Sequence, residues 1–108
     1  MIDKKVLFIT GAAIGIGHAA CLKFASEGYA IAFNDYNVEN GNKALEELKD
    51  KGYEAIFLPG DATKEEEVKA MVAKTVDTYG RIDTLINNAG AWEADLLLKV
   101  WKLSFGIG

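Results

Sequence analysis

Short apolar runs alternate with segments of helical periodicity along most of this chain, and the alternation limits the folds available to it. The runs with the length of strands buried on both faces of a sheet are residues 6–9, 29–34, 53–58 and 82–87. Segments with apolar positions on one helix face lie between them, at residues 16–27, 38–51 and 63–79. Strands that alternate with helices pair in parallel, and right-handed crossovers place the helices on both faces of the sheet. The sequence therefore predicts an α/β fold with the order βαβαβαβ.

Turn and capping residues mark the ends of the predicted helices. Gly28, Gly52 and Gly80 follow the helical segments, where a left-handed residue commonly ends a helix. Thr63 and Glu66 have the spacing of a capping box, in which each side chain bonds the backbone amide of the other residue. We therefore expect this pair to begin the third helix.

A glycine-rich segment, residues 10–17 with the sequence TGAAIGIG, joins the first predicted strand to the first predicted helix. Glycines at such a junction let the backbone turn tightly and let a pyrophosphate come close, while the amino end of the helix faces the phosphates. A glycine pattern alone is a weak signal, because glycine also marks bulges and tight packing. Its place between a strand and a helix is what indicates a nucleotide phosphate site.

Two aspartates and an asparagine-rich segment follow the later predicted strands. Asp35 lies where a carboxylate can accept hydrogen bonds from both hydroxyls of an adenosine ribose, although an Asp there can also start a turn or cap the next helix. Asp61 follows the third predicted strand, where a loop carboxylate near a helix start is the alternative interpretation. Residues 87–90, with the sequence NNAG, end the fourth predicted strand.

Together, these motifs resemble those of the short-chain dehydrogenase/reductase family, in the family's order, over residues 4–90. A methyltransferase of similar topology would give no account of residues 87–90. The resemblance implies a Rossmann-like, doubly wound parallel sheet that is incomplete here, with about four strands in the order 3-2-1-4. It also implies that Asp61 touches an adenine ring, that the first Asn of residues 87–90 ties neighbouring strands together, and that the Ala-Gly pair there lets a cofactor lie against bare backbone.

The family's nucleotide-binding positions carry over to this sequence residue by residue. They are Thr10, Gly11, Ile14, Gly15, Ile16, Gly17, Asp35, Tyr36, Asp61, Ala62, Asn88, Ala89 and Gly90. The implied ligand is a nicotinamide dinucleotide.

The residues around Asp35 favour NAD over NADP. The carboxylate would repel a 2′-phosphate. Members of the family that prefer NADP usually offer a basic residue just before the second glycine or just after the aspartate, and those positions here are Ile14 and Tyr36. His18 could approach the pyrophosphate, but we interpret it as a solvent-facing residue of the first helical turn. We therefore predict NAD(H) as the cofactor.

The catalytic residues of the family have no counterpart in this sequence. The family needs a Tyr that exchanges a proton with the substrate, a Lys four residues later, and a Ser that polarises the carbonyl. The residues found four positions after the tyrosines are Phe33, Asn40, Phe57 and Asp83. The serines are Ser26, inside a predicted helix, and Ser104, too close to Gly90 for the family's pattern. We nominate neither a catalytic residue nor a metal ligand.

We expect two parts in the chain. Residues 1–90 form a dinucleotide-binding half-domain, and residues 91–108 form a divergent tail of the kind that a truncation or a frameshift produces. An unpaired edge on the fourth strand and the apolar tail predict self-association. Two hypotheses follow: an oxidoreductase represented by its NAD(H)-binding portion and inactive as this chain alone, or a non-catalytic nucleotide-binding or interaction module.

Composition restricts the partners. The 108 residues carry a formal net charge of −4, which gives no reason to expect nucleic acid or an anionic membrane. Cys21 is the single cysteine, which excludes an internal disulfide and predicts a buried, structural thiol. No stretch approaches the ~20 apolar residues of a membrane span, and no signal-peptide layout is present. We expect a cytoplasmic protein.

Overall fold

A four-stranded parallel sheet runs through the part of the chain that the computed structural model describes, residues 2–90 and 102. Its strands lie in the order β3-β2-β1-β4. Their bounds are β1 Val6–Ile9, β2 Ala30–Asp35, β3 Ala55–Pro59 and β4 Thr84–Ile86. The register places Phe8 between Ala32 of β2 and Leu85 of β4. The predicted topology and strand order are confirmed.

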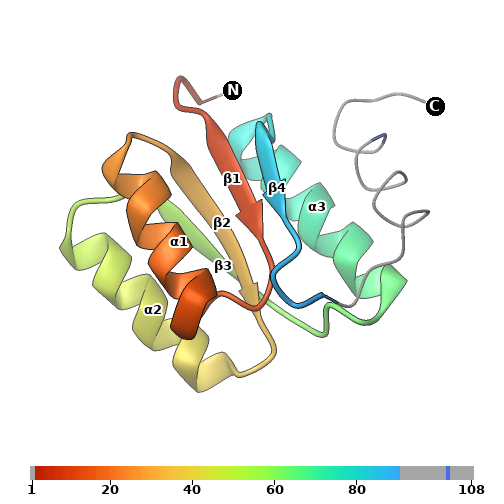
Figure 1. Cartoon of the computed structure of the whole chain (residues 1–108). Coiled ribbons are helices and arrows are strands. Elements are labelled where there is room, and N and C mark those ends of the chain that lie inside the picture. Colours follow the sequence, from red (N-terminus) through yellow and green to blue (C-terminus); the bar gives the residue numbers. More distant parts are fainter. Residues whose placement is uncertain (1, 91–101, 103–108) are drawn as a thin grey trace.

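Helices cover both faces of this sheet (Figure 1). They are α1 Gly15–Ser26, α2 Val38–Asp50 and α3 Glu65–Tyr79. Side chains along β1 alternate between the two faces of the sheet, so Leu7 and Ile9 lie in one core cluster, which contains Leu48 of α2. Val6 and Phe8 lie on the opposite face, in a second cluster with residues of α3. Each face of the sheet is therefore buried by its own helical layer.

The helix ends agree with the prediction at their glycines and differ from it at the start of α3. Gly28, Gly52 and Gly80 have φ values of 94°, 81° and 79°, the left-handed conformation expected after a helix. The prediction of a capping box between Thr63 and Glu66 is wrong, because Lys64 occupies the N-cap position and makes no side-chain capping bond. The hydroxyl of Thr63 instead donates to the nearby carboxylate of Asp61.

The predicted tail, residues 91–108, lies outside the described residues except for Lys102. Among the described helices, none combines the length and the apolar character that crossing a bilayer requires.

Candidate functional site

The loop from β1 into α1 depends on three glycines for different reasons. Gly11 and Gly15 have φ values of 63° and 65°, which residues with a side chain rarely adopt. A Cβ on Gly17 would lie 2.6 Å from the carbonyl oxygen of Gly11, so the loop can fold back on the helix only if this position is bare. The space around Gly15 is open within 4 Å, which leaves its backbone accessible to a ligand.

The amino end of α1 is left without a side-chain cap. Ile14 is the N-cap residue and makes no side-chain bond, and the first turn contains no acidic residue. The first amides of a helix have no intrahelical partner and carry a partial positive charge. Because the local side chains neither bond nor neutralise them, these amides can take a phosphate.

Asp35 is held against this loop by backbone amides from two directions. Its Oδ2 accepts a hydrogen bond from the amide of Ala13 at 3.0 Å, and its Oδ1 accepts one from the amide of Asn37 at 2.9 Å. The second bond means that Asp35 does start a turn, as the alternative interpretation held, while Asn37 caps α2. A carboxylate oxygen has two lone pairs, so both oxygens can still accept from a ribose.

Large exposed apolar side chains of the described residues lie in the segments that follow β1 and β2. They are Ile14, Ile16, Tyr36 and Val38, with exposed fractions of 64%, 84%, 78% and 53%. The bond between Asp35 and Ala13 brings these two segments together. Clustered exposed apolar groups beside a few fixed polar groups are typical of a ligand site.

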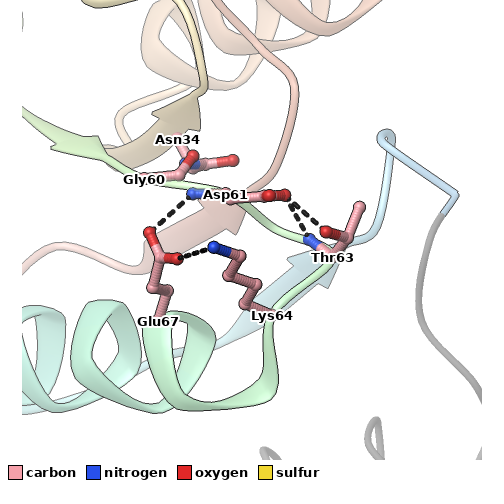
Figure 2. Close-up of polar contacts among 6 residues, drawn as sticks. All are labelled: Asn34, Gly60, Asp61, Thr63, Lys64 and Glu67. Atoms are coloured by element: carbon pink, nitrogen blue, oxygen red, sulfur yellow. Dashed lines mark hydrogen bonds and ion pairs between the residues drawn. The ribbon is translucent and has the colours of Figure 1, made fainter.

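The loop after β3 is built around Asp61 (Figure 2). Its carboxylate accepts bonds from the hydroxyl and the amide of Thr63, at 2.6 and 2.9 Å, and these bonds lower the pKa of Asp61 below its ordinary value. The amide of Asp61 donates to Oε1 of Glu67 at 3.0 Å. Ala62 packs into the core, so any ligand contact at this position would use its backbone. These bonds fix the turn after β3 and favour the charged form of Asp61.

The segment after β4 is bonded directly to the glycine-rich loop. The hydroxyl of Thr10 donates to Oδ1 of Asn87 and accepts from the amide of Ala89, both at 3.2 Å. Nδ2 of Asn88 donates to the carbonyl of Gly11 at 2.8 Å. The expected strand-tying bond of the first Asn is therefore present between the ends of β1 and β4.

Two predicted features are corrected or extended by the structure. His18 is not solvent-facing, because its side chain is only 18% exposed and its Nε2 lies 3.1 Å from Oε2 of Glu47 on α2. Asn34, which is not among the predicted site residues, links the loops after β1 and β3. A signal for Asn34 existed, since it is the polar residue that ends the apolar run of residues 29–34.

Other reactive groups give no second site in the described residues. Burial raises the pKa of the Cys21 thiol to about 12, which keeps it protonated and agrees with the structural role predicted for it. No group of three side chains suited to a metal ion occurs within residues 2–90.

Comparison with known proteins places these motifs in a family. The short chain dehydrogenase family model matches residues 5–104, so the resemblance continues past Gly90, although the division at residue 90 remains a prediction. An uncharacterized oxidoreductase of Thermotoga maritima is 48% identical over 86 residues, which are 80% of this chain and 34% of that protein. The chain therefore spans about a third of the length of this relative.

Solved structures share the fold over a similar portion. A short-chain dehydrogenase/reductase from Burkholderia phymatum in complex with NAD has a TM-score of 0.75 and 29% identity, over 77% of this chain and 30% of that one. Actinorhodin polyketide ketoreductase with NADPH has a TM-score of 0.77 and 30% identity, over 91% of this chain and 41% of that one. With its fold, its loop motifs and a family match over most of its length, the chain belongs to the short-chain dehydrogenase family.

Proposed function

We propose that this chain binds NAD(H) at the carboxyl ends of its strands, as the cofactor-binding portion of an oxidoreductase. The observation that carries the proposal is the bond between Asp35 and the amide of Ala13 beside the uncapped start of α1. It holds an acceptor suited to ribose hydroxyls next to amides suited to a pyrophosphate. Ribose hydroxyls and a pyrophosphate lie next to each other in the adenosine half of a dinucleotide.

The remaining loops supply groups that fit the rest of such a ligand. Asp61 and Ala62 would meet the adenine ring, and Ala89 and Gly90 offer bare backbone beside the glycine-rich loop. Gly90 has a φ of 69° and nothing within 4 Å of the position that a Cβ would take. When bound, the nicotinamide would supply hydride transfer, while the residues of this chain would bind and orient the dinucleotide.

The proposed preference for NAD(H) rests on charge. A 2′-phosphate beside the Asp35 carboxylate would be repelled, and the neighbouring Ile14 and Tyr36 bring no positive charge. Lys43 lines a hollow with Ile14 and Gly15, but its ammonium pairs with Oε1 of Glu39 at 3.4 Å. The cation that could serve a 2′-phosphate is thus already partly neutralised. Because related structures contain either NAD or NADPH, the proposed preference for NAD(H) rests on Asp35, Ile14 and Tyr36.

We infer that this chain alone does not turn over a substrate, because its sequence has no Tyr followed four residues later by Lys. The second candidate is a non-catalytic nucleotide-binding or interaction module. It is favoured by the edge of β4, which within residues 2–90 pairs with β1 alone. The proposed setting is the cytoplasm, in keeping with a buried free thiol at Cys21.

Titration calorimetry of the full chain with NADH and with NADPH tests the proposal. We expect saturable binding of NADH, weaker binding of NADPH, and no binding preference for NADH in an Asp35→Asn variant, which keeps the size of the side chain and removes its charge. Absence of binding to either nucleotide would contradict the proposed function. Tighter binding of NADPH by the wild-type chain would contradict the preference alone.

A further inference from the structure

Asn34 is a buried polar side chain at the carboxyl end of β2. It is 1% exposed in a strand whose other interior residues are apolar. Successive strand residues point to opposite faces, so Asn34 points to the α3 face while Asp35 reaches the loop before α1. A buried amide is costly unless all its hydrogen-bonding groups find partners.

Both amide hydrogens of Asn34 serve the segment that leaves β3. Nδ2 donates to the carbonyl of Leu58 and to the carbonyl of Gly60, each at 2.9 Å. Figure 2 shows Asn34 beside Gly60, immediately before Asp61. These bonds fix where the loop carrying Asp61 begins.

The acceptor groups of Asn34 serve the glycine-rich loop. Its backbone carbonyl accepts from the amide of Ala12 at 2.9 Å, and its side-chain Oδ1 lies 3.5 Å from the amide of Gly11, a long hydrogen bond. The pairing of β1 with β2 ends at Ile9 and Phe33. Asn34 therefore continues the contact between these segments one residue beyond the ladder, where β1 has already become a loop.

We propose that Asn34 is a positioning residue that sets the glycine-rich loop and the Asp61 loop relative to each other before a nucleotide binds. This inference rests on the proposed function, because it assigns the two loops to one ligand. A side chain at this place must donate twice toward β3 and accept from Gly11. Asparagine does both, whereas an aspartate carboxylate accepts only and an apolar residue does neither. A site assembled in advance does not spend binding free energy on ordering its loops.

The test compares nucleotide affinity with stability in the full chain. Asn34→Asp keeps the size of the side chain and its acceptor but removes both donors. Asn42→Asp, at an exposed position of α2, makes the same change of charge away from the loops. Val72→Ala, in the core beneath α3, lowers stability without removing any hydrogen bond that Asn34 makes. Asn34→Ser, which keeps one donor, replaces the first variant if that variant does not fold.

Two readouts separate positioning from a purely structural role. Calorimetry with NADH and with AMP should show affinities weakened about tenfold or more in the folded Asn34 variant, since two hydrogen bonds are lost, and unchanged affinities in both controls. Amide hydrogen exchange without ligand should become faster in residues 11–13 and in residues 60–63 of that variant alone.

Each outcome bears on a different claim. A folded Asn34 variant that binds NADH like the wild type would overturn the positioning role and leave the proposed function intact. A change of exchange in only one of the two loops would overturn the coupling between them. A wild-type chain that binds neither NADH nor AMP would contradict the proposed function itself.

Discussion

At the residue scale, the site depends on glycines, which lack a Cβ, as much as on side chains. Gly17 is buried in the first turn of α1, where alanine would ordinarily favour the helix by about 1 kcal/mol. Here a Cβ would also lie 2.7 Å from Nδ2 of Asn88 and 2.9 Å from Cα of Ala12. The clash is larger than the gain in helix propensity, because backbone atoms cannot move aside without displacing the loop.

We predict that Gly17→Ala lowers the free energy of unfolding by about 1–3 kcal/mol and reduces NADH affinity. Gly41→Ala is the matched control, since a methyl on this buried glycine of α2 would meet the ring of Phe57 on β3 and not the backbone of the glycine-rich loop. It should lower stability without weakening NADH binding. Urea denaturation and calorimetry measure the two effects, and full NADH affinity in Gly17→Ala would refute the argument.

At the element scale, β1 and β4 are joined at their amino ends by a charged contact. Oδ2 of Asp83 accepts from the amide of Val6 at 2.8 Å, and its carboxylate also pairs with the guanidinium of Arg81, at 2.6 Å from Nη2. The hydrogen bond from Arg81 is the largest cause of a lowered pKa at Asp83, followed among the favourable contacts by the amide of Val6. The charged carboxylate is therefore more stable in the folded state than in the unfolded chain.

This shift fixes the sign of a pH dependence. A carboxyl group with a lowered pKa contributes stability above its unfolded pKa, near 3.8, and loses that contribution as the pH falls through its folded value. We predict that Asp83→Asn costs about 1–2 kcal/mol at pH 7 and that its difference from the wild type shrinks as the pH falls below 3.8. Thermal unfolding across pH measures this difference, with exposed Asp77→Asn as the control. A difference that stays constant at low pH would show that Asp83 acts without its charge.

The elements themselves could be predicted because their signals are local. The apolar run before Thr10 and the glycines after each helix depend on residues close in sequence, and the strand order followed from the family resemblance. The capping of α3 could not be predicted, since Thr63 bonds either Asp61 or Glu66 according to how the loop turns. The contact of His18 with Glu47 depends on how α1 packs against α2, which no spacing within one helix reveals.

The same distinction explains which parts of the site were found. Glycines and aspartates at strand ends are visible in the sequence, and the structure brings Asp35, Asn88 and Ala89 to the glycine-rich loop. Asn34 was missed because its partners are backbone groups of a loop far along the sequence, and Glu67 because its partner is the backbone amide of Asp61. Hydrogen bonds to the backbone leave no pattern of side-chain types.

At the scale of the whole molecule, one edge of the sheet is a candidate for association. Within the described residues β4 pairs with β1 only, and Leu85 and Ile86 are half-buried. The other edge strand, β3, ends at Pro59, which cannot donate a hydrogen bond to an added strand. We therefore expect the β4 edge to be the one that pairs with further chain.

We predict concentration-dependent self-association of the chain through this edge. Sedimentation velocity should give a mass above 11.7 kDa that rises with protein concentration. Thr84→Lys, which places a charge on the edge, should reduce the association, whereas Thr78→Lys on the exposed side of α3 should not. A constant monomer mass at all concentrations would contradict the prediction.

The central claim is that a dinucleotide lies across the carboxyl ends of β1, β2, β3 and β4. Nuclear magnetic resonance of the full chain titrated with NADH tests it most directly, because the backbone amides of all four loops are observed together. The predicted result is saturable shifts of the amides in residues 11–17, 35–37, 60–63 and 88–90, with those at the opposite ends of the strands unchanged. Shifts confined to other surfaces, or no saturable shifts at all, would contradict the account.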